Sequence, residues 1–307
     1  MKSSVVRPGS GIGWGSEHPW VCRALPWLAA GAVLVLALIK PQAVCAHGDV
    51  HLRILALSAQ IKAATNNAAR LYLERGELER EHGLWGAAAA DYDRAAQLEP
   101  GLPSVDRCRA KLLADRGQLE AARAMFDQAL QRDPADGESF VGRARVRLKL
   151  GRRQAAIADF WRGLELLREP APEYVVELAQ MLAAEGQVAE ALRALDEGIK
   201  KLGPIMPLQG YALDLELGRK DNEAALARLE TILARAMRKE SWFARRGDIL
   251  LEVGRTAEAR KSYEAALAAV KRLPGRLQQG PAMVKLQIHV NAALAGITNA
   301  PAAGQLK

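Results

Sequence analysis

A single glycine recurs along most of this 307-residue chain at intervals close to 34 residues. The recurring residues are Gly83, Gly117, Gly151, Gly186, Gly218 and Gly254, with gaps of 34, 34, 35, 32 and 36. A fixed interval of this size indicates a structure built from stacked units, in which each unit buries its apolar face against its neighbours. The chain is therefore expected to form an array of similar units.

The residues that follow each glycine repeat one helical pattern. A small residue stands five positions after the glycine, a bulky residue four positions later and a second small residue three positions after that. These offsets place all three on one face of a helix. Proline then ends most units, because it lacks the N–H that another helical turn requires. The residues are Ala88, Ala122, Ala156, Ala191 and Ala259, then Tyr92, Phe126, Phe160, Leu195 and Tyr263, then Ala95, Ala129, Gly163, Gly198 and Ala266, with prolines Pro100, Pro134, Pro170, Pro204 and Pro274.

The composition favours helices over strands. Residues 87–90 are all alanine, and aromatic residues make up only 5% of the chain. Alanine has the highest helix propensity, whereas β-branched and aromatic residues favour strands. Each unit is therefore predicted to consist of a helix, a glycine turn, a second helix and a proline turn. Small residues where the two helices cross allow their backbones to approach closely.

Residues 71–100 and 109–134 carry this pattern most completely, and both stretches resemble tetratricopeptide repeats. The resemblance covers about residues 69–272 and implies an all-α, right-handed superhelical solenoid of about six helical hairpins. The residues that carry it are Leu71, Tyr72, Arg75, Gly76, Gly83, Ala88, Tyr92, Ala95 and Pro100 in the first stretch, and Arg109, Ala110, Gly117, Ala122, Phe126, Ala129 and Pro134 in the second. The predicted units of the 68–272 array are about 69–102, 103–136, 137–171, 172–203, 204–239 and 240–273.

The fifth unit departs from the pattern. It begins with the irregular segment Gly203–Pro207 and has one extra residue before its Ala224-Ala225 pair. Its first helix is therefore expected to be short.

The two ends of the array are predicted to be capped by helices. Residues 47–67 comprise a polar start and a capping helix. Residues 274–297 form a second capping helix, and residues 298–307 a disordered tail. The predicted apolar faces are Leu52, Leu55 and Ile61 at the first cap and Met283, Leu286, Val290 and Leu294 at the second.

The first 46 residues are typical of a secretory signal peptide with a long n-region. Ala24–Ile39 carries no charge, is shorter than the roughly 20 residues of a membrane-spanning helix, and precedes the small-residue cleavage pattern Val44-Cys45-Ala46. The protein is therefore expected to be exported, periplasmic or secreted, and to meet the membrane only during export. The alternatives are an uncleaved signal that anchors the chain, a lipid anchor at Cys45, and a tethered scaffold that faces the cytoplasm.

Charge does not indicate a nucleic-acid ligand. The chain has a formal net charge of +8, but four basic residues and one acidic residue lie in the first 46 positions, which leaves +5 for the remainder. Basic and acidic residues alternate along the predicted helices, and no run of basic residues forms.

Cleavage of the signal peptide would leave Cys108 as the single cysteine of the chain. A buried thiol is the simpler interpretation of this residue.

The resemblance implies a concave surface lined by the first helix of each hairpin, where a peptide or a partner protein binds. Four basic residues on neighbouring helices could bind an acidic peptide or a carboxylate terminus; they are Arg107, Lys111, Arg145 and Lys149. The alternative is that they are solvated surface charges. Glu77, Cys108 and Glu138 occupy positions at which chaperone-binding members hold a terminal carboxylate, so that activity is not expected. The predicted groove residues are Arg70, Glu77, Arg107, Lys111, Arg145, Lys149 and Gln180.

No catalytic motif and no cofactor site is recognisable, so the chain is predicted to be a non-catalytic interaction scaffold or adaptor outside the cytoplasm. One alternative is copper handling by His47 and His51, because cleavage after Ala46 would put a free amine on His47. A polar, flexible N-terminus explains the same residues. A second alternative is an accessory subunit of an enzyme complex.

Overall fold

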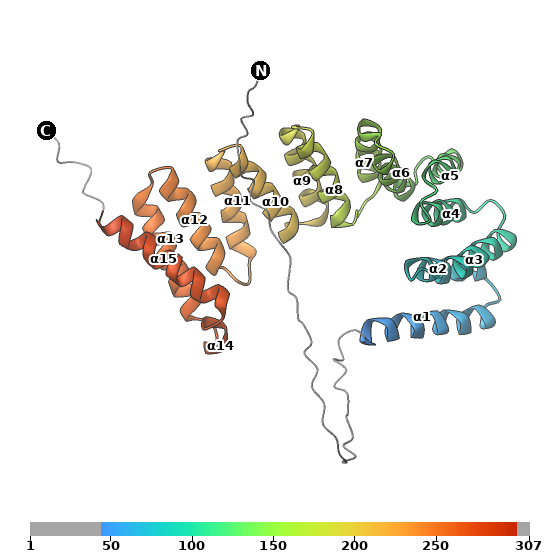
Figure 1. Ribbon diagram of the computed structural model, residues 1–307, viewed down its shortest axis with the longest axis horizontal. Helices are drawn as coiled ribbons and strands as arrows, with labels where there is room; N and C mark the ends of the chain where they lie inside the picture. Colours follow the sequence, from blue (N-terminus) through green and yellow to red (C-terminus); the bar gives the residue numbers. More distant parts are fainter. Residues whose placement is uncertain (1–43, 300–307) are drawn as a thin grey trace, which may run out of the picture. The chain divides into compact units, whose positions relative to one another are not determined.

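The structure of the protein is a computed structural model that describes residues 44–299. Within this range fifteen helices follow one another and no strand occurs. Figure 1 shows the helices as coiled ribbons that succeed one another along the chain. The predicted all-α repeat fold is confirmed. Residues 48–299 belong to one compact unit.

Twelve of these helices form six consecutive hairpins. Each helix packs against its hairpin partner, and the second helix of a hairpin contacts the first helix of the next. The hairpins are α2 (Ala68–Glu81) with α3 (Trp85–Leu98), α4 (Pro103–Asp115) with α5 (Leu119–Arg132), α6 (Gly137–Lys149) with α7 (Arg153–Leu166), α8 (Pro172–Ala184) with α9 (Val188–Leu202), α10 (Met206–Gly218) with α11 (Asn222–Arg235), and α12 (Glu240–Glu252) with α13 (Thr256–Lys271). Helix α1 (Val44–Ala63) precedes them, and α14 (Gly275–Gln278) and α15 (Pro281–Asn299) follow.

One residue in each hairpin turn adopts a left-handed backbone conformation. In five hairpins it is a glycine with φ between 74° and 76°, as expected for the residue without a Cβ. In the fifth hairpin it is Lys220, with φ of 59°. We call these six residues the turn positions; they are Gly83, Gly117, Gly151, Gly186, Lys220 and Gly254.

Two expectations for the fifth hairpin are therefore wrong. Gly218 is the last residue of α10 and not the turn residue, and no extra residue precedes the alanine pair. Counted from Lys220, the buried residues Ala225, Leu229 and Ile232 stand at the same offsets as in the other hairpins. The expected short helix is also absent, because α10 has 13 residues, as α8 has. Pro207 lies in its first turn, where a missing N–H breaks no hydrogen bond.

Close contact between the helices depends on small residues beneath aromatic rings. A Cβ at Gly76 would lie 2.6 Å from a ring carbon of Tyr92, and one at Gly247 would lie 2.5 Å from a ring carbon of Tyr263. Both rings are fully buried. A large ring thus packs against a small residue at both crossings, which allows the helices to approach closely.

The first capping helix buries only part of its predicted apolar face, since Ile61 is half-buried but Leu52 and Leu55 are not. Leu57 is buried, whereas Leu52 and Leu55 are more than half exposed, so the expectation that these two face the array is wrong. Polar contacts also attach α1 to α2: Arg53 donates to Glu74 over 3.2 Å, and Arg75 donates to the Ser58 hydroxyl over 2.9 Å.

Helix α15 packs on the last hairpin. Val290 is fully buried, and Leu286 and Leu294 lie against the core cluster that contains Tyr263. The helix ends at Asn299, beyond the predicted start of the tail at residue 298.

The predicted signal peptide lies almost wholly outside the described residues, since only 44–46 are described and these begin α1. Residues 300–307 of the predicted tail also lie outside them. No helix between residues 44 and 299 has the length and apolar character needed to cross a membrane.

Candidate functional site

The first helices of the first four hairpins line a pocket of about 270 Å³. Most of its lining residues come from α6. Helices α2, α4 and α8 contribute others, and α5 contributes one. The lining residues are Arg80, Glu81, Lys111, Ala114, Asp115, Phe126, Glu138, Val141, Gly142, Arg145, Val146, Lys149 and Tyr174.

The floor of this pocket is apolar and depends on one glycine. A Cβ at Gly142 would lie 2.5 Å from a ring carbon of Phe126, so only glycine leaves room for the ring. Phe126 is 1% exposed, and Val141 and Val146 beside it are also buried. These buried side chains form a closely packed apolar floor beneath the charged residues that line the pocket.

Most of the cations near the pocket are already paired with carboxylates. Lys111 donates to Glu77 over 3.0 Å, and Arg107 donates to Asp136 over 2.6 Å. Arg145 forms a bidentate pair with Glu177 at 2.8 and 2.6 Å. Three of the four basic residues predicted to attract an acidic peptide are thus neutralised within the protein.

Two charged groups of α6 lack an ion-pair partner among residues 44–299. Lys149 has none at the end of the helix, and Glu138 has none in its first turn. Eleven residues separate them, or about 16 Å along a helix. The pocket therefore presents a free ammonium at one end and a carboxylate at the other.

Tyr174 orders the carboxylate end. Its hydroxyl donates to Glu138 over 2.9 Å, and the Arg145 guanidinium lies over its ring at 4.9 Å from the centroid. Burial, and then the nearby Glu138 carboxylate, raises the pKa of Tyr174 to about 12. The hydroxyl therefore stays protonated and remains a hydrogen-bond donor at neutral pH.

A second pocket of about 270 Å³ lies between α6 and α8. Leu148, Met181 and Ala184 contribute apolar groups, Gln180 supplies an amide, and the charged Arg153 of α7 also lines this pocket. Arg145 lines the first pocket and its partner Glu177 lines the second, so this ion pair stands between them.

The structure brings together only some of the predicted groove residues. Lys111, Arg145 and Lys149 line the first pocket and Gln180 lines the second. Arg70 is exposed and lines neither of these two pockets, and Glu77 and Arg107 act as ion-pair partners.

Tyr174 and Phe126 also line the first pocket, although neither is among the predicted groove residues. A glycine inside a helix often marks a position where another group packs close to the backbone. Gly142 could therefore have indicated that a bulky side chain such as Phe126 packs against α6.

Glu77 is the centre of a charged network next to the first pocket. It accepts hydrogen bonds from Tyr92, Lys111 and Arg80 at 2.7, 3.0 and 3.1 Å. Burial alone would raise the pKa of Glu77, but Lys111, Tyr92 and Arg80 outweigh this effect and together lower the pKa to about 2.

Cys108 lies near Glu77 and is 4% exposed, as expected for a buried thiol. Burial, and then the Glu77 charge, raises the pKa of Cys108 to about 12.

The predicted copper ligands are only partly described. His51 is an exposed residue of α1, and the side chain of His47 lies outside the described residues. Among the side chains that are described, no group of three or more His, Cys, Asp or Glu residues could hold a metal ion.

Comparison with protein families gives matches over more than half of the chain. A tetratricopeptide repeat family matches residues 109–165 and 141–204, and a tetratricopeptide repeat-like domain family matches residues 213–287. No curated protein matches the chain.

Solved structures of tetratricopeptide repeat proteins are similar to this chain at low sequence identity. The C-terminal part of a TPR repeat-containing protein from Cytophaga hutchinsonii is 13% identical and has a TM-score of 0.52. The match covers 78% of this chain and 95% of that one. A tetratricopeptide repeat protein from Parabacteroides merdae is 19% identical over 85% of this chain and 96% of that one, with a TM-score of 0.41. YrrB, described as a TPR protein with an unusual peptide-binding site, is 15% identical over 66% and 97%, with a TM-score of 0.45.

Proposed function

Because this chain belongs to the tetratricopeptide repeat family, we propose that it is a non-catalytic adaptor that binds an extended segment of a partner protein on its first helices. The proposal places the segment across α4, α6 and α8. Proteins of this family serve in general as interaction scaffolds, and their fold alone does not specify a ligand.

The observation that carries the proposal is the pair of pockets on either side of the Arg145–Glu177 ion pair. Alternate side chains of an extended peptide point the same way, so two of them can enter neighbouring pockets. The first pocket offers an apolar floor at Phe126 and charged groups around it. The second offers Leu148 and Met181. A segment with two anchoring side chains therefore fits this surface best.

Charge restricts where an acidic group of the partner would bind. Arg107, Lys111 and Arg145 are already paired, and removing either member of such a pair leaves its partner charge unsatisfied. Lys149 has no such partner among the described residues and lines the first pocket. We therefore assign the recognition of one partner carboxylate to Lys149, and not to a broad basic stretch.

We also propose that the adaptor acts outside the cytoplasm. The uncharged segment Ala24–Ile39 and the small residues at Val44-Cys45-Ala46 support export and cleavage. N-terminal sequencing of the protein recovered from the exporting cell tests this proposal. A first residue of His47 is expected, and an intact N-terminus would contradict cleavage of the signal.

Crosslinking from a matched pair of positions tests the binding surface. Leu148 and Leu251 each stand three residues before a turn position and are 37% and 38% exposed. A photoreactive residue at 148 is expected to capture a partner segment, and one at 251 is not. Capture from 251 alone would contradict the assignment.

The captured segment, made as a synthetic peptide, then permits a direct affinity measurement. Lys149→Glu should weaken its binding at least about tenfold, since a favourable contact with a carboxylate becomes a repulsion. Lys261→Glu on the exposed face of α13 makes the same charge change away from the pockets. Equal affinity of the Lys149→Glu variant and the unmodified protein would overturn the role of Lys149.

A further inference from the structure

The outer face of α15 is apolar and has no helix packed on it among the described residues. Val290 points into the core, but Val284 and Ile288 are 42% and 66% exposed. The small residues Ala292, Ala295 and Gly296 continue the same exposed side, and Lys285 is the only charged residue of this 19-residue helix. A terminal capping helix ordinarily presents a polar outer face.

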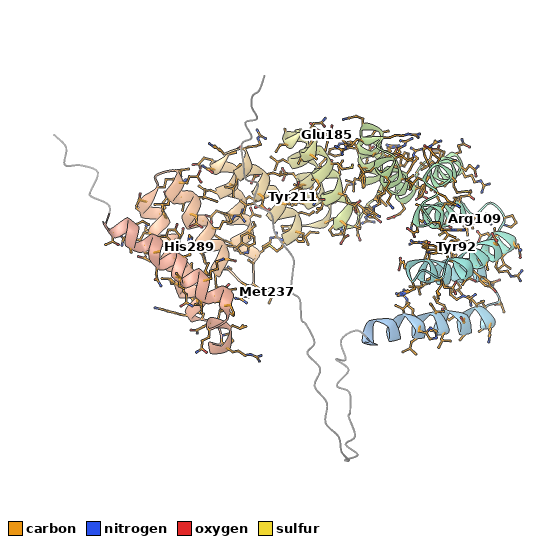
Figure 2. All side chains as sticks on the ribbon, viewed as in Figure 1. Tyr92, Arg109, Glu185, Tyr211, Met237 and His289 are labelled. Atoms are coloured by element: carbon orange, nitrogen blue, oxygen red, sulfur yellow. The ribbon has the colours of Figure 1, made fainter. Side chains whose placement is uncertain are left out.

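Hydrogen bonding shows which repeat position this face corresponds to. His289 lies on α15 (Figure 2), and its Nε2 is 2.8 Å from Asp248, six residues before a turn position. Lys111 contacts Glu77 of the preceding hairpin in the same way, at 3.0 Å. Helix α15 therefore packs on α12 and α13 as α4 packs on the hairpin before it.

This correspondence identifies the missing neighbour. With His289 matched to Lys111, Ile288 matches Ala110 and Val284 matches Asp106. Ala110 is fully buried and Asp106 is 4% exposed, because α4 packs against its hairpin partner α5, where Arg132 also pairs with Asp106. In α4, this face packs against α5, the second helix of the same hairpin. The exposed face of α15 is therefore the face on which a hairpin partner would pack.

We propose that α15 of a second copy of this chain covers this face, antiparallel and across a two-fold axis. The side chains on this face are large in the first half of α15 and small in its second half. An antiparallel pair centred near residue 290 places Val284 opposite Gly296 of the second copy and Ile288 opposite Ala292. Large residues would then meet small ones, as Tyr263 meets Gly247 within the chain. A two-fold axis produces such self-complementary contacts from one helix.

Charge is compatible with this pairing. The two copies of Lys285 would be offset by ten residues, or about 15 Å along the helix axis. That separation exceeds the Debye length of about 8 Å at physiological ionic strength, so their repulsion is screened.

Helix α1 of a second copy fits the same face less well. It contacts α2 as a second helix contacts the hairpin that follows, since Arg75 binds Ser58 as Arg143 binds Asp127. However, Arg53 aligns with the position five residues after each turn position, where all six second helices have alanine, and it would meet Ile288. Two large side chains prevent the close approach that the hairpins show.

The size of the contact sets the expected affinity. A 19-residue helix is about 28 Å long, and one helix pair buries less than the roughly 1,200 Å² typical of stable complexes. The dimer is therefore reversible and depends on protein concentration.

Sedimentation equilibrium of the purified protein over a wide concentration range tests the proposal. The unmodified protein should pass from monomer to dimer as concentration rises, and Ile288→Glu should remain monomeric. Leu52→Glu is the matched control, because Leu52 is 65% exposed on α1, and it should dimerise normally. Circular dichroism of each variant verifies that the helices remain folded.

A cysteine pair tests the antiparallel geometry. Ile288→Cys combined with Ala292→Cys should form a disulfide-linked dimer on oxidation, whereas Leu52→Cys should not. A protein that stays monomeric at every concentration overturns the proposal. A dimer that Ile288→Glu leaves intact, or a cysteine pair that fails to crosslink, also overturns it.

Discussion

Tyr92 donates a hydrogen bond of 2.7 Å from its hydroxyl to Glu77, and Tyr263 makes the same bond to Asp248 five hairpins later. In both hairpins the acceptor stands six residues before the turn position and the tyrosine nine residues after it. The second hairpin has Lys111 and Phe126 at these positions. The hydroxyl therefore occurs where a carboxylate is present to accept its hydrogen bond.

Loss of one such hydroxyl should destabilise the protein. Tyr92→Phe is expected to lower the free energy of unfolding by about 1–2 kcal/mol, because it removes a hydrogen bond to a charged acceptor. Tyr211→Phe is the control, since no hydrogen bond of the Tyr211 hydroxyl is found within residues 44–299. Urea denaturation monitored by circular dichroism measures both, and equal stabilities would contradict the prediction.

The low pKa of Glu77 predicts a pH-dependent contribution to stability. The pKa falls from 4.5 to about 2 in the folded protein, so the ionised carboxylate stabilises the fold above pH 4.5. This contribution declines as the pH falls toward 2, because protonation then favours the unfolded chain. Glu77→Gln should lower stability by about 3 kcal/mol at pH 7, since each pKa unit corresponds to about 1.4 kcal/mol.

The stability difference between the unmodified protein and Glu77→Gln should narrow between pH 5 and pH 2, as followed by thermal unfolding. Glu99→Gln removes an exposed carboxylate with no ion pair in the described chain and should have little effect. A difference that stays constant with pH would argue against the assigned role of Glu77.

The left-handed conformation of Lys220 predicts a stabilising substitution. A non-glycine residue at φ of 59° bears a steric cost, so Lys220→Gly should raise the free energy of unfolding by up to about 1 kcal/mol. The reverse change, Gly254→Ala, should lower it by about 1–2 kcal/mol, because φ there is 76°. Chemical denaturation of both variants measures these opposite signs. A loss of stability in Lys220→Gly would show that the lysine side chain contributes more than its backbone strain costs.

Close packing at Gly247 predicts that an added methyl group is harmful there. Gly247→Ala would place a Cβ 2.5 Å from the ring of buried Tyr263 and should cost about 1–3 kcal/mol. Gly218→Ala is the matched control at the end of another first helix, because nothing lies within 4 Å of its Cβ position. It should be neutral or slightly stabilising, since alanine favours helix. Similar melting temperatures for the two variants would refute this prediction.

The sequence alone determined the repeat, the helical hairpins and the fold class. These features rest on local signals, because glycine and proline set backbone angles within a turn and apolar spacing follows the helical period. The local signal is misleading at Gly218, because a residue other than glycine, Lys220, adopts the turn conformation within the fifth hairpin.

Only the tertiary structure decided which charges are free and where the pockets lie. Arg107, Lys111 and Arg145 form a basic set in the sequence, yet their carboxylate partners stand 29, 34 and 32 residues away. Such pairs depend on the distance and rotation between neighbouring hairpins, which no local spacing encodes. The pocket at Gly142 and the uncovered face at Ile288 arise from the same packing, because each depends on which helix, if any, lies opposite.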